Sequence, residues 1–266
     1  MRKLIALAVV CATALVFATV AYAVNIYKVT PASTKGGGGA KGTAKKPVAK
    51  AVVFGFTAKG PGTERSTPIQ KYSIGFQGLK YFGNKRVFPR CTLAKVQQVL
   101  ESDVEKDCKK AFIGKGIVDN RVGPTTQPAV TSATCRLRLR LYNTGKGFAL
   151  RLDGGSTAKP PTACPLAINQ AIDARFKSVR IAGRKSAALV FTVDDTLRHP
   201  GSPALSNSIA NTTSTITGKK RKVKIAGKTR RVSVLSSVGC GRRRTIQVAF
   251  TDEAGSTVPA NASVKC

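Results

Sequence analysis

Hydrophobic and polar residues alternate along much of the chain, which is the pattern of strands that bury one face of a sheet. The alternation is clear over residues 52–58 and 72–76. Further strands are predicted at residues 172–181, 187–193, 209–217, 221–225 and 232–238. Many short strands separated by turn residues predict a mainly β fold, an antiparallel β-sandwich-like domain. The pattern leaves open whether the strands form one β unit or two smaller ones.

The strongest alternation predicts a β-hairpin in the middle of the chain. Residues 135–141 place leucines on one face and arginines on the other, and residues 148–153 supply the partner strand. A loop at 144–147 then sets three cross-strand pairs: Leu141 with Leu150, Arg138 with Asp153, and Arg140 with Arg151. We therefore expect a half-buried hairpin with a basic outer face, in which the two facing arginines modestly weaken the sheet.

A second hairpin is predicted from the alternation over residues 246–250 and 258–264. The turn between them would place Thr251 opposite Gly255. This register leaves two arginines on the core side, Arg242 and Arg244. We therefore expect the regular ladder to begin near Thr245, after irregular chain.

One short helix is predicted over residues 92–106, where hydrophobic residues recur at spacings of three and four. Thr92 is placed to cap its first turn. Four acidic residues cluster near its end, Glu101, Asp103, Glu105 and Asp107. A calcium loop would need a glycine that is missing here. We expect a solvated acidic face, or one that docks on the protein's own basic surface.

The first residues read as an export signal. Arg2 and Lys3 precede an apolar run at 4–20, and Ala21-Tyr22-Ala23 is a small-x-small cleavage site. An uncleaved membrane anchor is the alternative, because the run is at the lower limit of a spanning length. Residues 1–23 are thus predicted to be a signal peptide, 24–50 a disordered Gly/Ala/Lys/Pro tether, and 51–266 the β domain. After cleavage no transmembrane span is expected.

The cysteines that follow the predicted cleavage site form an even set: Cys91, Cys108, Cys135, Cys164, Cys240 and Cys266. In an exported chain this predicts disulfides, and no paired metal-ligand spacing competes with them. Cys91 and Cys108 bracket the predicted helix, and the C-terminal register places Cys240 opposite Cys266. The middle pair, Cys135 with Cys164, follows by elimination. We expect a secreted or cell-envelope-associated protein.

Charge changes the picture most, because 45 Lys and Arg stand against 12 Asp and Glu, a formal charge of +33. The basic residues gather in three clusters. The densest holds Lys219, Lys220, Arg221, Lys222, Lys224, Lys228, Arg230 and Arg231. The others are Arg242, Arg243 and Arg244, and Arg136, Arg138 and Arg140. They predict binding of polyanions such as anionic envelope polymers. The alternative is a solubilising charge that guards strand edges, as in a purely structural surface module.

Little in the sequence indicates catalysis. The nucleophile-elbow, zinc-protease and phosphate-loop motifs are absent, and His199 is the one imidazole. We therefore expect a non-enzymatic protein that needs no cofactor or metal; an enzyme with an unrecognised site that uses His199 is the alternative. No Trp is present, and aromatic residues do not interleave with the basic clusters. Sequence-specific recognition of nucleic acid is therefore not expected.

Two short segments echo each other, Val-Arg-Ile-Ala-Gly-Arg at 179–184 and Val-Lys-Ile-Ala-Gly-Lys at 223–228. A duplication would explain them, but the similarity fades outside six residues. Shared tight-turn chemistry is the favoured interpretation.

Several stretches spread over the β domain resemble secreted proteins of high-GC Gram-positive bacteria that have no established activity. The resembling segments are Lys71-Tyr-Ser-Ile-Gly-Phe-Gln-Gly-Leu79, Phe88-Pro-Arg-Cys91, Leu141-Tyr-Asn-Thr-Gly145 and Lys265-Cys266. None of them is a specific motif. The resemblance implies export, a tether and a Cys-stapled β domain, and it assigns no functional residue.

Overall fold

The computed structural model of the chain describes residues 25–30, 34–35, 42–61, 65–98, 100–127, 133–155 and 164–266. Within them the protein is mainly β, with a large antiparallel sheet, as the alternation predicts. The predicted signal peptide at 1–23 lies outside the described residues.

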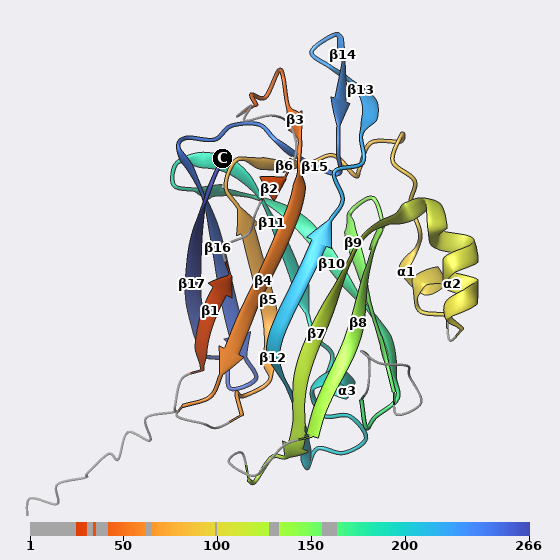
Figure 1. The fold of residues 1–266 in the computed structure, drawn as a ribbon, viewed down its shortest axis with the longest axis vertical. Helices are drawn as coiled ribbons and strands as arrows, with labels where there is room; N and C mark the ends of the chain where they lie inside the picture. Colours follow the sequence, from red (N-terminus) through yellow and green to blue (C-terminus); the bar gives the residue numbers. More distant parts are fainter. Residues whose placement is uncertain are drawn as a thin grey trace, which may run out of the picture.

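The large sheet has twelve strands, and all their pairings are antiparallel. In order across the sheet they are β1 (Ile26–Thr30), β4 (Ala51–Lys59), β12 (Leu205–Ile216), β7 (Phe112–Pro124), β8 (Ala133–Asn143), β9 (Gly147–Gly154), β10 (Ile168–Ile181), β11 (Arg184–Thr192), β5 (Ile69–Phe76), β16 (Arg243–Asp252) and β17 (Thr257–Lys265), while β2 (Thr34–Lys35) pairs with β4. The sheet curls until its edge strands β1 and β17 lie side by side, so it is nearly closed (Figure 1).

Two small sheets lie at one end of the large one. One combines β3 (Val48–Ala49), β15 (Leu235–Ser237) and β6 (Leu79–Tyr81), and the other is the hairpin of β13 (Arg221–Ile225) and β14 (Lys228–Val232). The hairpin projects at the top of Figure 1.

The helices are short: α1 (Leu93–Val96), α2 (Glu101–Cys108) with a 3-10 turn at Lys109–Ala111, and α3 (Asp195–Arg198). The first two flank the outer side of β8 to β10, and α3 lies at the opposite end from β13–β14 (Figure 1). Among the described residues, no helix is long and apolar enough to cross a membrane.

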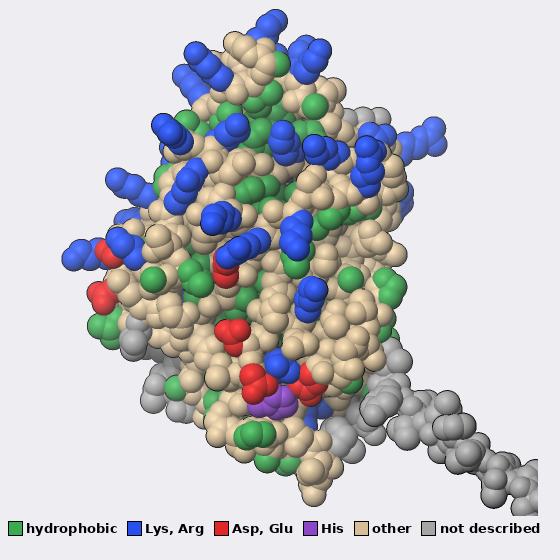
Figure 2. All heavy atoms as spheres, turned by 180° about the vertical axis from the view of Figure 1, so that it is seen from behind, with side chains coloured by type: hydrophobic (Ala, Val, Ile, Leu, Met, Phe, Trp, Pro, Cys, Tyr) green, Lys and Arg blue, Asp and Glu red, His purple; other side chains and the backbone are tan. Residues whose placement is uncertain are grey.

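The two kinds of charge are segregated on the surface. Figure 2 shows Lys and Arg spread over the upper part of one face, while Asp and Glu gather in its lower part around the single His. On this face, Lys and Arg therefore dominate the end that lies opposite the single His.

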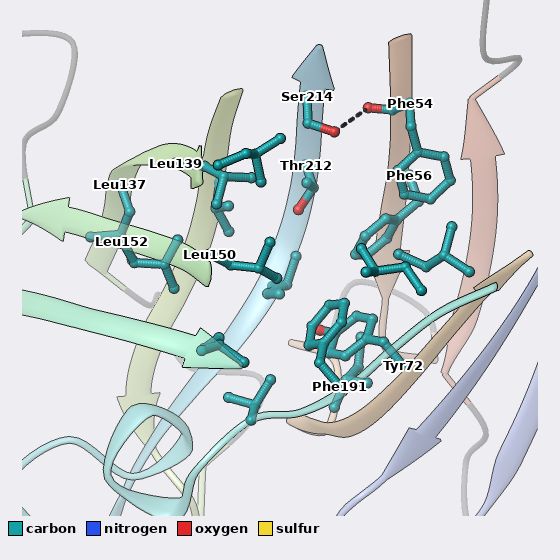
Figure 3. Close-up of a pocket in the computed structure, with 18 of the residues that line it drawn as sticks. Phe54, Phe56, Tyr72, Leu137, Leu139, Leu150, Leu152, Phe191, Thr212 and Ser214 are labelled. Atoms are coloured by element: carbon teal, nitrogen blue, oxygen red, sulfur yellow. Dashed lines mark hydrogen bonds between the residues drawn. The ribbon is translucent and has the colours of Figure 1, made fainter. Parts of the chain in front are cut away.

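The inward face of the curled sheet forms the main core. Phe56, Tyr72 and Phe250 meet there, with the Phe56 and Phe250 ring centroids 4.8 Å apart. Leucines from β8 and β9 face them across the interior, and an apolar cavity of about 110 Å³ remains between the two groups (Figure 3).

The register of the central hairpin is confirmed. Strands β8 and β9 pair Leu141 with Leu150, Arg138 with Asp153, and Arg140 with Arg151. The disulfides are confirmed as well: Cys91–Cys108, Cys135–Cys164 and Cys240–Cys266.

The predicted helix over 92–106 is divided into α1 and α2. The predicted cap is present, since the Thr92 hydroxyl accepts from the Lys95 amide. The division occurs where Arg151, from the strand beneath, donates to the carbonyl oxygens of Val96 and Gln98 at 2.5 and 2.7 Å. Because those carbonyls accept from a side chain, they do not accept the backbone hydrogen bonds that a continuous helix would need.

The C-terminal register differs from the prediction by two residues, because Thr251 lies opposite Thr257 and not Gly255. The Asp252 carboxylate accepts from the Ser256 amide and so organises a longer turn. A shift of two residues keeps the side chains of the ladder on their expected faces, but Arg242, expected on the core side, precedes the ladder and is exposed. The ladder also begins at Arg243, before the expected start near Thr245, and Arg244 points into the core.

Part of the segment predicted as a tether belongs to the β domain. Strand β1 pairs with β4, the Tyr27 ring stacks on Phe250 with centroids 4.2 Å apart, and Val29 is buried. Lys50 is buried too. The Gly/Lys-rich composition that indicates a tether begins only after β1. The prediction of a tether over 24–50 therefore missed the short strand that precedes this composition.

Candidate polyanion-binding surface

The β13–β14 hairpin carries the densest basic cluster. Ala226 and Gly227 both have positive φ, which is the two-residue turn that suits the twist of a hairpin. Val223 and Val232 are buried and attach the hairpin to the main core. The turn therefore projects the charged part of the hairpin away from the body of the protein.

All the cations predicted for this cluster lie on the hairpin or just before it, and they are exposed or partly exposed. Lys222 and Arg231 lie directly opposite each other in the ladder. Like charges in that position destabilise a hairpin unless something neutralises them. No residue of the hairpin forms an ion pair with another described residue.

A basic groove that the sequence analysis missed lies near this hairpin. It has a volume of about 610 Å³, and its basic lining residues are Lys80, Lys177, Arg184 and Lys185. No acidic residue lines it, and its floor includes the stacked rings of Tyr81 and Phe176, with centroids 4.4 Å apart. Strand β6, on one side of the groove, belongs to the same small sheet as β3, which β14 contacts.

The groove lies beside the tip of the β10–β11 hairpin, the first of the two echoed segments. Its turn, Ala182–Gly183, has nearly the same positive φ values as the turn of β13–β14, so the two echoed segments form the same type of hairpin turn. Arg180 lies opposite Lys185, another like-charged pair. The basic tip repeated in the two echoed segments was the sequence signal that could have indicated the groove. Lys80, however, comes from a distant segment, and no local sequence pattern connects it to that tip.

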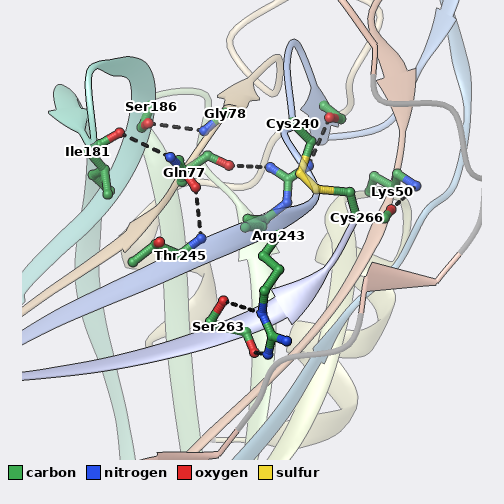
Figure 4. The surroundings of a disulfide bond; sticks show 12 residues. Lys50, Gln77, Gly78, Ile181, Ser186, Cys240, Arg243, Thr245, Ser263 and Cys266 are labelled. Carbon is green, nitrogen blue, oxygen red and sulfur yellow. Dashed lines mark hydrogen bonds between the residues drawn. A yellow bond between two sulfur atoms is a disulfide. The ribbon is translucent and has the colours of Figure 1, made fainter.

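The second predicted cluster is divided between surface and core. Arg242 and Arg243 are exposed, and Arg243 donates to the Ser263 hydroxyl and carbonyl. Arg244 is fully buried, close in the chain to Cys240, whose disulfide with Cys266 is shown in Figure 4. It is therefore not available to a polyanion.

Arg244 keeps its charge in the core through neutral partners. Its guanidinium donates to the Gln77 carbonyl and to the Ser237 hydroxyl. Burial lowers its pKa to about 10. Lys50 is buried nearby, and burial, followed by the charge of Arg244, lowers its pKa. No described acidic side chain pairs with either cation, and the Lys50 ammonium donates to a main-chain oxygen of Cys266 at 3.5 Å.

The third predicted cluster is neutralised by the protein's own acids. Arg136 pairs with Asp119, and Arg138 with Glu101 at 2.5 Å. Arg140 is buried and reaches three carboxylates, at 2.8 Å from Glu101, 2.8 Å from Glu105 and 3.0 Å from Asp153. The arginines on the expected basic outer face of β8–β9 are therefore all paired with carboxylates, and these three arginines are not a free anion site.

The acidic cluster is divided between the two alternatives. Glu101 and Glu105 dock α2 on the arginines of β8, whereas Asp103 and Asp107 are exposed to solvent. Burial alone would lower the pKa of Arg140, but the Asp153 carboxylate and its neighbours raise it. No group of His, Cys, Asp and Glu among the described residues is arranged to hold a metal ion.

His199 is engaged in structural contacts on both sides of its ring. Nδ1 lies 2.7 Å from the Leu205 carbonyl oxygen, and Nε2 lies 2.7 Å from the Glu253 carboxylate. Both partners are acceptors, so both contacts are satisfied only by the protonated imidazolium. Burial opposes that state, but the Leu205 carbonyl and Glu253 raise the pKa of His199. In this state the ring offers no lone pair that could take a proton from a substrate.

Comparison with known proteins supplies no further constraint, because no protein family, no curated protein and no solved structure matches the chain. The candidate site therefore rests on the geometry alone. It consists of the β13–β14 hairpin and the neighbouring basic groove, which together are called the cationic end below.

Proposed function

We propose that this is an exported, non-enzymatic protein that binds anionic polymers of the cell envelope or extracellular space through its cationic end. The observation that carries the proposal is the unpaired charge of β13–β14, where Lys222 and Arg231 face each other without a carboxylate. An anionic polymer would relieve that repulsion at several positions at once. Three disulfides and the predicted signal peptide support an oxidising, extracytoplasmic location.

The distribution of ion pairs supports binding at one end of the protein. Acids pair with some of the basic residues elsewhere, as Asp119 does with Arg136 and Asp173 does with Arg175, whereas no described acid pairs with the hairpin. Between Gly218 and Val232 no acid occurs. Positive charge that needed only to keep the protein soluble would not have to collect on one projecting hairpin.

The test compares two variants that lose equal charge from different places. The first carries Lys222→Gln, Lys224→Gln and Arg231→Gln on the hairpin. The control carries three changes at exposed positions on other strands: Lys59→Gln, Lys71→Gln and Lys115→Gln. Binding to heparin and to polyphosphate is measured over a range of salt concentrations.

We expect the hairpin variant to bind more weakly and to lose about one unit of salt slope for each contact removed, whereas the control keeps most of the wild-type affinity. Equal losses in both variants would show that only net charge matters. Binding by the wild type that is absent, or insensitive to salt, would overturn the proposal and leave an inert, structural charge.

A further inference from the structure

The interior cavity has polar groups on its wall that nothing in the described structure satisfies. Strand β12 lies between β4 and β7 in the sheet, yet its inward residues include Asn207, Thr212 and Ser214. Ser214 donates to the Phe54 carbonyl at 3.2 Å. The Thr212 hydroxyl and the Asn207 side-chain oxygen have no partner, although both residues are more than nine-tenths buried.

Two further orphan atoms face the same cavity. Asn120, on the neighbouring strand β7, leaves its side-chain oxygen without a partner, and so does the hydroxyl of Tyr72 on β5. Tyr72 is 1 % exposed and Asn120 3 %. In Figure 3, Tyr72 lies across the space from the leucines of β8 and β9, beside Phe191, and Thr212 lies on the β12 wall.

Leaving such groups unpaired is costly, at about 1–3 kcal/mol for each buried donor or acceptor. Most of the remaining wall is apolar, supplied by residues such as Leu139, Leu150 and Phe56. An apolar enclosure with a few convergent polar atoms is the usual form of a small-molecule site. Hydroxyl and amide side chains that face an apolar core are unfavourable for packing. Packing alone therefore does not explain why β12 carries them.

The cavity also limits the charge and size of an occupant. Among the described residues on its wall, Arg198 has the one charged side chain, and its guanidinium already bonds to Glu253 at 2.9 Å and to Asp195 at 3.0 Å. A charged ligand would find no free counter-charge there. The volume of about 110 Å³ is below the roughly 150 Å³ of an engineered cavity known to admit benzene, so a single ring would enter only if side chains of the wall moved outward, and nothing larger than one ring would fit.

We propose that this cavity is a binding site for a small neutral molecule with a ring-sized apolar body and a hydroxyl group, for which phenol is the simplest probe. The ring would lie among the leucines and phenylalanines. The hydroxyl would bond to the orphan atoms of Thr212 and Tyr72. This site lies inside the sheet and does not depend on the cationic end.

The test measures phenol and toluene binding to the full chain, because toluene has a similar ring and lacks the hydroxyl. Two variants remove one orphan atom each, Thr212→Val and Tyr72→Phe. The matched control is Thr215→Val, which makes the same change at an exposed position of β12. Binding is followed by calorimetry and by contacts between ligand protons and the Leu139 and Leu150 methyl groups in NMR spectra.

We expect saturable binding of one phenol per protein, with toluene binding about tenfold more weakly. Both inward variants should fold, since each removes an unsatisfied polar atom, and should abolish the preference for phenol while leaving toluene unaffected. Thr215→Val should behave as the wild type. The proposal is overturned if phenol does not saturate, if the preference survives both inward variants, or if a crystal grown with phenol contains only ordered water in the cavity.

Discussion

Two arginines on the outer face of β8–β9 show how this protein turns a repulsive pair into a structural one. Arg140 and Arg151 lie directly opposite each other, and both donate to the Asp153 carboxylate, at 3.0 and 2.7 Å. Arg151 is 0 % exposed and also bonds to the carbonyls between the first two helices. The pair therefore joins α1 and α2 to the sheet.

Replacing Arg151 by Met should be strongly destabilising, because Asp153 loses a partner and two buried carbonyls lose their donor. We expect a loss of about 3–5 kcal/mol in the free energy of unfolding, measured by urea denaturation. Arg175→Met is the control, since Arg175 pairs with Asp173 at an exposed site and should contribute at most about 1 kcal/mol. Similar losses in the two variants would contradict this role for Arg151.

His199 should make stability depend on pH near neutrality. The groups that face it are Glu253, the Leu205 carbonyl and, through the shared carboxylate, Arg198, with Asp195 nearby. Because its folded-state pKa is raised above 6.5, the folded state binds the proton more tightly than the unfolded chain does. Its contribution is therefore complete below about pH 6.5 and is lost as the pH rises through the folded-state pKa.

The measurement compares wild type with His199→Gln from pH 5 to pH 9. The advantage of the wild type in free energy of unfolding should be largest at acidic pH and should shrink as the pH rises. NMR titration of the ring gives the pKa directly. A value below 6.5, or an advantage that grows with pH, would be incompatible with the contacts described.

At the scale of elements, the close pairing of β7 with β12 depends on glycine. A Cβ atom on Gly116 would lie 2.1 Å from the Thr213 carbonyl oxygen, and one on Gly114 would lie 2.3 Å from that of Thr215. Real contacts are never that short, so the two backbones approach closely only because these side chains are absent. The bulge of β12 between Ile209 and Asn211 lies in the same pairing.

Gly116→Ala should therefore push the two strands apart and cost about 1–3 kcal/mol in the free energy of unfolding. Gly155→Ala is the control, because a Cβ there meets its nearest atom at an ordinary 3.6 Å. Thermal and urea unfolding of both variants supply the measurement. The explanation fails if Gly116→Ala unfolds at the same urea concentration as the control.

The same pair of strands marks the limit of what alternation can predict. Residues 112–124 were not expected to form a strand, because glycines and charges interrupt the hydrophobic pattern. In β12 the strand was expected, but its inward hydroxyl and amide side chains do not differ in kind from outward ones. A polar lining inside the sheet therefore cannot be read from the sequence.

The hairpins were predictable in more detail because loop length and parity fix a register. Parity placed Arg244 in the core, and the structure confirms this even though a buried arginine is unfavourable by itself. What could not be predicted was long-range pairing. Nothing local indicates that Glu101 would neutralise Arg138, or that Lys80 would join Arg184 in one groove.

At the scale of the whole molecule, the ion pairs show which of the basic residues behind the formal charge of +33 have no carboxylate partner. The few carboxylates bond to arginines of the sheet and to α3, and leave the cationic end without counter-charge. If the proposed function holds, the protein would approach an anionic surface with its cationic end first, and salt would screen the approach. The proposed polyanion-binding surface and the interior cavity thus belong to different parts of the fold.

The strand order also sets a time at which folding can be completed. Phe54 of β4 lies opposite Ser214, 160 residues later, and β5 lies between β11 and β16. Hairpins such as β8–β9 can form as soon as their residues are available, but β4 and β5 must wait for partners from the last third of the sequence. Contacts this distant belong to slowly folding β proteins, with times of milliseconds to seconds. We therefore expect the large sheet to remain incomplete until nearly the whole chain has been synthesised, and the curled sheet to close last.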